Sequence, residues 1–456
     1  CVEKGKVSSL MCSYNAVNGA PTCANRWLLD TVARKAWGFD GYITSDCDAV
    51  ANVLSPHHYV KTAEEAVAVT LKAGMDVDCS YFVGQHGMSA FDEGLIDEPL
   101  VDARLASGFR VRMRLQHFDP PGPLQQIGPS ALCSPRAAAI ARAGAAQGAV
   151  LLKNQNAALP LDAAALRSLS LAIVGPNAQL AKAIAGYYGP AAACSGYPTV
   201  LDAVRQRVPA SVKVSFAAGV PSVLSTDTSM VKAAAALAAT AAATILVLGT
   251  DLSVAMENHD AVNLTLSAGQ LALVEAVAAA AAGKPVIVVT LTAVPLDLTP
   301  LLSDSRLKAI LHAGQPSVQT HGVVDVLFGD ASPAGRAVQT VYPVEYQRMV
   351  SPFDFNMRPG PSIWPRPDSP GPCTDSYVGP VLPSKNCTLG TNPGRTYRFY
   401  NGTAVVPFGY GLSFTTWSYS LISAPRVAHL DRLRHLLART RDRTGAAAFP
   451  ALTTVK

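Results

Sequence analysis

Two carboxylates, Asp46 and Asp48, follow directly on a short apolar run with β-strand character, in the sequence GYITSDCD. A strand that carries a carboxylate at its C-terminal end is how barrel enzymes place a nucleophile. Upstream, Ser9–Cys23 is a second apolar run that ends in a polar, asparagine-rich turn, and downstream Ala73–Cys79 is a third. Because three such strand ends follow one another along the chain, we predict that their side chains lie on the same rim of a barrel.

Two further interpretations apply to these carboxylates. If the chain stays extended past Ser45, alternation points Asp46 and Asp48 to the same side, so the two compete for one role. On spacing alone, Asp46 is also suited to cap a helix or to form an ion pair just past a strand.

The elements around them follow a βα pattern. Residues 1–118 alternate strand-like runs with helical segments, which we place at Thr62–Lys72 and Leu95–Leu115. A complete barrel of this kind needs eight strands and roughly 250 residues, and this segment supplies about three strands. The proline run DPPGPL then predicts a linker over residues 119–136.

A second pattern begins at about residue 137. A helix is predicted through Lys153, and alanine-rich helices then separate continuous apolar runs, which is typical of a mostly parallel sheet covered on both faces. The turn LAIVGPNA lacks both GxGxxG and GxxxxGK, so it supports a nucleotide site only weakly. The predicted strands are Leu171–Val174, Lys213–Phe216, Ala243–Leu248, Pro285–Leu291 and Leu307–Leu311.

Several ordered blocks resemble family 3 of the glycoside hydrolases, in its plant and fungal β-xylosidase/α-L-arabinofuranosidase branch. The blocks include MCSYN..NG..TC, GYI.SDCD, GMD.DC, GAVLLKNQNAALPL, LAIVGPNA, DVLFGDASPAGR, FNMRP, GRTYRFYNG and PFGYGLSFT, within about residues 5–420. The resemblance implies an α/β chain that begins with the C-terminal part of a (β/α)8 TIM-like barrel and continues into an α/β sandwich. The implied domains are a partial barrel (1–118), a linker (119–136), the sandwich (137–345), an irregular strap towards a missing or truncated fibronectin III-like domain (346–420) and a basic tail unlike the family (421–456).

The resemblance assigns roles in the first domain. Asp46, directly after Ser45, matches the family's nucleophile, while Met11 and Tyr14 match residues that line the sugar site; packing at an apolar strand end is their alternative. Cys47 stands where many family β-glucosidases have tryptophan, which favours a pentose over glucose.

The acid/base is expected on the loop after the strand at Ala243–Leu248. There the branch reads approximately G.D.SIEAEF.DR and this chain reads GTDLSVAMENHDA, so Glu257 matches the second glutamate, while the first glutamate and the arginine are replaced by Ala255 and Ala261. If the family's proton donor is the second glutamate, Glu257 can take that role. If the donor is the first glutamate, this chain has no proton donor at that position. We favour Glu257, with a solvated loop glutamate as the alternative.

The implied function is retaining, exo-acting hydrolysis that releases terminal β-D-xylose, or α-L-arabinofuranose, from xylan or arabinoxylan fragments by double displacement, without a cofactor. The chain is expected to be an N-terminally truncated piece that is weak or inactive alone, because family groups that grip the sugar lie on earlier barrel strands. Three alternatives stay open: a β-glucosidase, a non-catalytic carbohydrate-binding remnant favoured by Ala255 and Ala261, and a flavodoxin-like ligand-binding domain.

Composition and motifs limit the classes of binding partner that the sequence indicates. The net charge of +5 is mild for 456 residues and does not indicate binding to nucleic acid. The sequence contains no uninterrupted run of eighteen apolar residues, so no membrane-spanning helix is predicted. The histidines form no HxxxH or HExxH pattern and no GxSxG is present, so no metal site or serine triad is predicted. The basic tail could bind an anionic surface, although a solvated helix is the simpler interpretation. The oligomeric state is left open.

Nine cysteines and three sequons, at Asn263, Asn386 and Asn401, favour a secreted, disulfide-bonded glycoprotein of the cell wall, or a vacuolar one. Local spacing and the resemblance together suggest the bridges Cys12–Cys23 and Cys47–Cys79, and Cys373–Cys387 would close a short loop. The odd number leaves at least one thiol unpaired.

Overall fold

The computed structural model describes residues 1–123, 125–165, 169–181, 188–189, 194, 196–368 and 388–423. The chain divides into two compact units, Cys1–Gly128 and Pro129–Lys456, and each is described by itself. The division falls inside the proline-containing segment 119–136. The basic tail from residue 424 and the predicted Cys373–Cys387 bridge lie outside the described residues.

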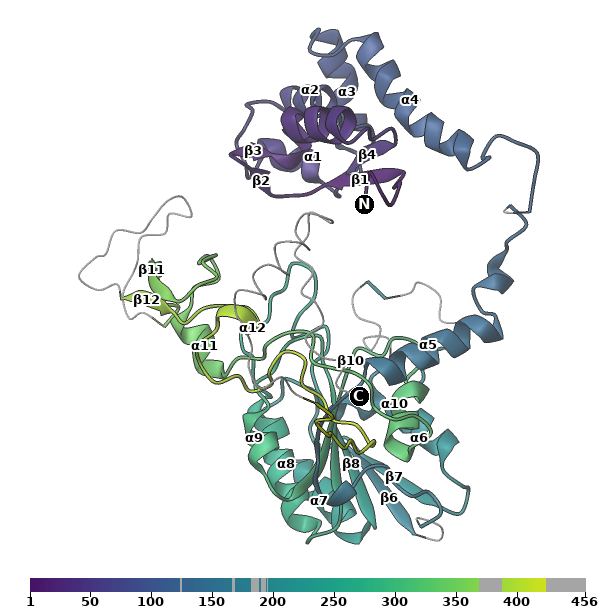
Figure 1. The fold of residues 1–456 in the computed structure, drawn as a ribbon, viewed down its shortest axis with the longest axis vertical. Coiled ribbons are helices and arrows are strands. Elements are labelled where there is room, and N and C mark those ends of the chain that lie inside the picture. Colours follow the sequence, from purple (N-terminus) through teal and green to yellow (C-terminus); the bar gives the residue numbers. More distant parts are fainter. Residues whose placement is uncertain are drawn as a thin grey trace. The chain divides into compact units, whose positions relative to one another are not determined.

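The first unit is built on parallel strands. β1 (Ser9–Cys12) pairs in parallel with β4 (Tyr42–Ser45), and a bridge from Thr44 to Val77 adds a third parallel segment. Ile43 is fully buried at the centre of the core that these strands and the helices enclose. The other elements are β2 (Ala16–Val17), β3 (Ala20–Pro21), η1 (Thr22–Ala24), η2 (Trp27–Ala36), α1 (Ala49–Leu54), α2 (Ala63–Ala73), α3 (Phe82–Asp92) and α4 (Glu98–Arg114) (Figure 1).

Side-chain caps set the starts of the two helices that the sequence predicts. Thr62 and Glu65 form a reciprocal capping box at the start of α2. Asp97 caps α4 by accepting a hydrogen bond from Leu100 N, so α4 begins three residues later than predicted. The sequence analysis missed η2, α1 and α3. That the unit is part of a closed barrel stays a prediction.

The second unit contains a six-stranded sheet of order β5–β10–β9–β8–β6–β7. All neighbours run parallel except β5, which pairs antiparallel with β10 at one edge. The five predicted strands are all present, with each end within three residues of its predicted position. The six strands of the sheet are these five together with β5, and their bounds are β5 (Val150–Asn154), β6 (Ser170–Val174), β7 (Lys213–Ala217), β8 (Ala243–Gly249), β9 (Val286–Leu291) and β10 (Leu307–Gly314).

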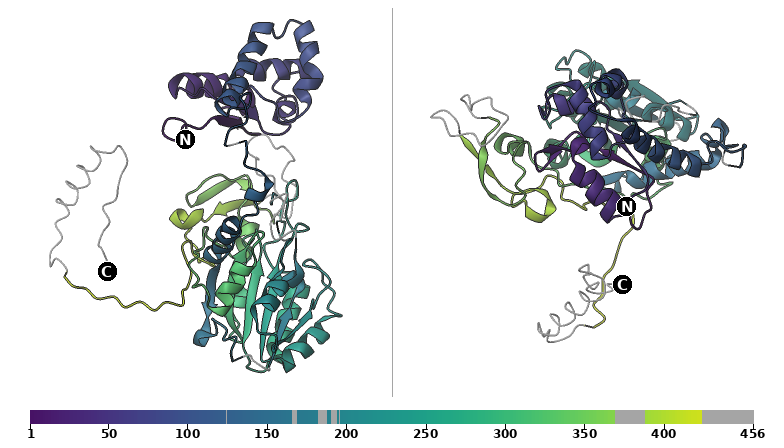
Figure 2. Two further views of the ribbon diagram at one scale, coloured as in Figure 1. Left: turned by 90° about the vertical axis from the view of Figure 1, so that its right-hand side faces the viewer. Right: turned by 90° about the horizontal axis from the view of Figure 1, so that it is seen from above.

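Helices cover both faces of this sheet, as continuous apolar strands require. Figure 1 shows one group of helices on each side of the sheet, and the turned views of Figure 2 agree. Alternate strand residues therefore enter two separate cores. One face carries α5 (Pro135–Gly148), α6 (Val200–Arg207) and α10 (His321–Phe328); the other carries α7 (Val231–Thr240), α8 (Ala268–Ala280) and α9 (Thr299–Ser303).

The prediction that the helix continues through Lys153 is wrong. Helix α5 stops at Gly148, and residues 150–154 form strand β5. Val150 and Leu152 pack into one core and Leu151 into the other, so the segment is buried on both faces, which a strand inside the layers achieves and a surface helix does not.

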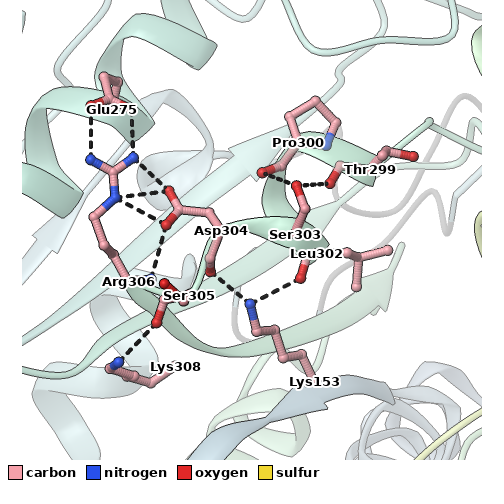
Figure 3. A network of polar contacts seen from close by, with 10 residues as sticks. All are labelled: Lys153, Glu275, Thr299, Pro300, Leu302, Ser303, Asp304, Ser305, Arg306 and Lys308. Carbon is pink, nitrogen blue, oxygen red and sulfur yellow. Dashed lines mark hydrogen bonds and ion pairs between the residues drawn. The ribbon is translucent and has the colours of Figure 1, made fainter.

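A polar network fixes the turn between α9 and β10 (Figure 3). The Lys153 ammonium, largely buried on β5, donates to the carbonyl oxygens of Leu302 (3.0 Å) and Asp304 (2.7 Å), and burial lowers the pKa of Lys153. Arg306 forms ion pairs with Glu275 (2.5 Å) and Asp304 (2.8 Å). The network joins the edge strand, the turn and α8.

The segment that follows the sheet returns to its edge. Leu412 N donates to Leu151 O (2.8 Å) on β5, and Tyr410 Oη donates to Leu152 O (3.2 Å). The segment predicted as an irregular strap thus contains short regular elements and packs on the second unit. The remaining elements are η3 (Pro129–Ala131), η4 (Gln155–Ala157), η5 (Pro176–Gln179), α11 (Val344–Met349), β11 (Gly360–Pro365), β12 (Leu389–Asn392) and α12 (Thr396–Phe399).

Candidate active site

Asp46 lies directly after β4 and is held by backbone contacts on both sides. Its amide donates to Cys12 O (2.9 Å) at the end of β1, and its carbonyl accepts from Ala49 N (3.0 Å) at the start of α1. The carboxylate Oδ1 accepts from Cys47 N (2.8 Å) and the side chain is half-buried. Asp46 therefore sits in a fixed strand-to-helix turn and is only partly shielded from solvent.

A polar cluster joins this turn to the next strand end. Ser45 Oγ donates to Asp78 Oδ1 (3.2 Å) and accepts from Cys79 N (2.8 Å), while Asp78 Oδ2 accepts from Val83 N (2.9 Å) in α3. A disulfide links Cys47 to Cys79 and ties the two loops covalently. The sequence analysis did not assign Ser45 or Asp78, although both lie in its SDCD and GMDVDC blocks.

Met11 and Tyr14 lie beside Asp46 on the neighbouring strand end. Met11 pairs with Thr44 in the register of β1 and β4, and it is 59% exposed, while Tyr14 is 42% exposed. Both side chains are therefore well exposed in the first unit, and packing within a complete barrel stays the alternative. His57 Nε2 donates to the carbonyl oxygen of Tyr14 (2.6 Å) and so fixes the loop that carries the phenol. Asp46, Met11 and Tyr14 thus follow or lie on the neighbouring ends of β1 and β4, and their roles at a sugar site stay predictions.

Asp48 departs from the predicted alternation. The extended conformation ends at Ser45, and Asp48 has φ = +64°, in the left-handed region, just before α1. Its side chain makes no capping hydrogen bond and is exposed. Because the backbone turns here, Asp46 and Asp48 do not occupy equivalent positions on one extended face.

Glu257 lies in the second unit, on the loop between β8 and α8. Met256 and His259 exchange two backbone hydrogen bonds (3.0 and 3.1 Å), so Glu257 and Asn258 are the two central residues of a tight hairpin. Asn258 has φ = +60°, which asparagine tolerates in such turns. Glu257 is exposed at the hairpin tip, whereas Ala255, where the resemblance places a glutamate, packs against a core.

The base of this loop is rigidly held. Gln270 in α8 accepts from Gly249 N (3.0 Å) and donates to Gly249 O (3.0 Å) and Val223 O (2.8 Å). Asn177 Nδ2, fully buried after β6, donates to Thr250 O (3.0 Å). The hairpin therefore projects from a fixed point at the carboxyl end of β8, where open α/β sheets commonly bind ligands.

Replacing Gln270 by alanine should destabilise the second unit by about 3 kcal/mol, because three backbone groups lose their partners and buried groups without partners are costly. The measurement is the midpoint of urea unfolding. Gln206 on α6 supplies the matched control, because its side chain meets the His321 ring (2.8 Å) at the exposed surface, and Gln206→Ala should shift the midpoint far less. Equal midpoints for both variants would contradict the anchoring role.

The predicted bridges Cys12–Cys23 and Cys47–Cys79 are confirmed. A third bridge, Cys133–Cys194, joins the segments before α5 and α6 and was not predicted, because its 61-residue separation gives no local signal. The exposed Cys1 is a free thiol.

Within the described residues, no group of three or more His, Cys, Asp or Glu side chains is arranged to hold a metal ion. Nor does any helix of that part of the chain combine the length and apolarity needed to cross a membrane.

Comparisons with known proteins identify the same family in both units. Residues 1–106 match the glycosyl hydrolase family 3 N terminal domain, and residues 149–414 match the family's C-terminal domain. The chain is 38% identical to "Beta-xylosidase/alpha-L-arabinofuranosidase 2" of Medicago sativa subsp. varia over 94% of this chain and 51% of that protein. "Beta-D-xylosidase 3" of Arabidopsis thaliana gives the same identity and the same shares.

A similar solved structure is that of a GH3 exo-beta-xylosidase in complex with a xylobiose aziridine activity based probe, at 32% identity and a TM-score of 0.76. The alignment covers 92% of this chain and 50% of that one. The chain thus spans about half the length of the relatives that it matches.

Proposed function

Because this chain belongs to glycosyl hydrolase family 3, we propose that it is part of a retaining, exo-acting glycosidase that releases terminal β-D-xylose from xylan-type oligosaccharides. Terminal α-L-arabinofuranose is a second product, in keeping with the relatives named for both activities. The observation that carries the proposal is Asp46, held at a strand end beside the exposed Met11 and Tyr14. Cys47 favours a pentose over glucose at this site, because it stands where many family β-glucosidases have tryptophan.

In the proposed reaction, Asp46 attacks the anomeric carbon while Glu257 protonates the leaving glycosidic oxygen. This produces a covalent xylosyl-enzyme ester, and Glu257 then removes a proton from the water that hydrolyses it. Asp46 must stay ionised, while Glu257 must be protonated when substrate binds. Glu257 is exposed in this chain, so its carboxyl group is accessible to a substrate.

The proposed location is extracellular, in the cell wall, or vacuolar. Three disulfides support passage through an oxidising compartment. The proposed substrates are fragments of xylan or arabinoxylan. We expect lower turnover from this chain alone than from the relatives, because it spans about half of their length and catalysis depends on contacts that position the substrate.

The test is hydrolysis of 4-nitrophenyl β-D-xyloside, with 4-nitrophenyl β-D-glucoside as the competitor. The xyloside should have the higher kcat/KM. Faster hydrolysis of the glucoside would instead support a β-glucosidase.

A second candidate is a carbohydrate-binding remnant without catalysis. The observation that favours it is the loss of a glutamate at Ala255, which now packs against the core. Saturable xylobiose binding in calorimetry, with no turnover and no covalent labelling of Asp46, would support the remnant and contradict the enzyme.

Glu257→Gln should slow the hydrolysis of a xyloside with a poor leaving group, such as methanol, at least about 10²-fold, because this is the usual contribution of general acid–base catalysis. A 2,4-dinitrophenyl xyloside should react almost normally in the first step, because its leaving group needs no proton. Azide should restore turnover by replacing the water that Glu257 would activate. Exposed Glu345 on α11 offers a control, and Glu345→Gln should change none of these rates.

A further inference from the structure

The loop between β8 and α8 carries a sequon, Asn263–Leu264–Thr265, that the proposed catalysis does not use. We propose that Asn263 carries an N-linked oligosaccharide, whose first sugar packs on Val262 and steadies the loop that holds Glu257. This proposal rests on the proposed passage through the secretory compartment, and it does not depend on the proposed catalysis.

The hydrogen bonds within the sequon use the side-chain oxygen of Asn263 and leave its reactive nitrogen, Nδ2, available. Asn263 Oδ1 accepts from Thr265 N (3.2 Å) and from Thr265 Oγ1 (2.9 Å). The Nδ2 atom makes no hydrogen bond to the described residues, and the side chain is exposed. In the transfer, Nδ2 bonds to C1 of the first sugar, the C1–O bond to a lipid diphosphate carrier breaks, and Nδ2 loses a proton.

The folded chain has room for this modification, because the middle residue of the sequon is anchored inwards. Leu264 N donates to Gln347 Oε1 (3.3 Å), and Leu264 O accepts from Asp297 N (2.8 Å). The Leu264 side chain packs against the core between the sheet and α8. A bulky group on Asn263 therefore extends into solvent without displacing the anchored backbone.

Val262 gives the first sugar a surface to cover. Its side chain is 93% exposed, next to the modified residue. The less polar face of a sugar ring can pack on such a side chain and remove it from water. Because Val262 lies five residues after Glu257 on the same loop, this contact would slow the opening of the hairpin.

The site is tested on chain secreted from a yeast host behind a heterologous signal sequence. Peptide:N-glycosidase in H₂¹⁸O converts each glycosylated asparagine to ¹⁸O-labelled aspartate, which peptide mass spectrometry locates. We expect the label at Asn263 and its loss in Thr265→Ala, with retention of at least part of it in Thr265→Ser. The exposed sequon at Asn401 reports that the host modifies the chain. An unlabelled Asn263 overturns the proposal, whether or not Asn401 is labelled.

The packing on Val262 is tested by hydrogen exchange of the loop over residues 251–262. The reference has the same sequence but is made in a bacterial periplasm, which forms disulfides without adding the glycan. We expect the glycosylated chain, including the form trimmed to one sugar, to exchange several-fold more slowly than this reference. Glycosylated Val262→Ser should exchange like the reference. Equal exchange in all forms overturns the contact, and neither measurement uses turnover.

Discussion

Asp46→Asn is expected to abolish covalent labelling of this chain by 2,4-dinitrophenyl 2-deoxy-2-fluoro-β-D-xyloside. The reagent's leaving group needs no general acid, and the fluorine slows breakdown of the ester, so the first displacement is observed even where turnover is low. In the parent chain, the fluoroxylosyl group should appear on the peptide that contains Asp46. Asparagine keeps the acceptor oxygen for Cys47 N but is not a nucleophile, so we expect a loss of roughly 10⁴-fold or more in labelling rate.

Asp48→Asn is the matched control. It makes the same chemical change two residues away, and asparagine tolerates the left-handed conformation at φ = +64°. We expect the labelling rate of this variant to be within about twofold of the parent's, since Asp48 lies outside the extended strand end. Labelling that survives in Asp46→Asn and disappears in Asp48→Asn would transfer the nucleophile to Asp48 and refute our assignment.

Asp76→Asn is expected to destabilise the first unit by about 3–5 kcal/mol, the usual effect of breaking a buried ion pair. The Asp76 side chain is fully buried between Arg34 and Arg104, with Arg104 Nη1 3.3 Å away, and it also accepts from Ile43 N (2.7 Å). Burial raises the pKa of Asp76, and the two guanidinium groups oppose this rise. Without the carboxylate, two positive charges remain together in a poorly solvated site next to β4.

The measurement is hydrogen exchange of the amides of β4 in increasing urea, which reports opening of the first unit within the full chain. Asp40→Asn provides the control, since Asp40 pairs with Arg114 at an exposed surface and such pairs contribute little. A loss for Asp76→Asn no larger than that for Asp40→Asn would show that the buried cluster does not hold the strand. The prediction bears on the candidate active site, because the buried Asp76 cluster holds β4 and Asp46 follows this strand directly.

Much of the local structure follows from the sequence because local chemistry determines it. Thr62 with Glu65 marks a helix start, and the continuous apolar runs of the second unit predict buried strands within a few residues. The carboxylate Asp46 at the end of GYITS is predicted for the same reason, since a strand followed by a polar turn is a pattern over neighbouring residues. Residues 150–154 were misassigned because their apolar run fits a buried helix end as well as an edge strand, and only pairing with β10 separates the two.

The sequence by itself determined the family-like blocks, five of the six strands of the large sheet, the position of Asp46 and two of the disulfides. Tertiary structure alone decided that Asp76 joins Arg34 and Arg104, that Cys133 meets Cys194 and that Glu257 is at an exposed hairpin tip while Ala255 faces a core. The physical reason is distance along the chain. Capping and strand periodicity are interactions between near neighbours, whereas burial and ion pairing depend on which remote segments the fold brings together.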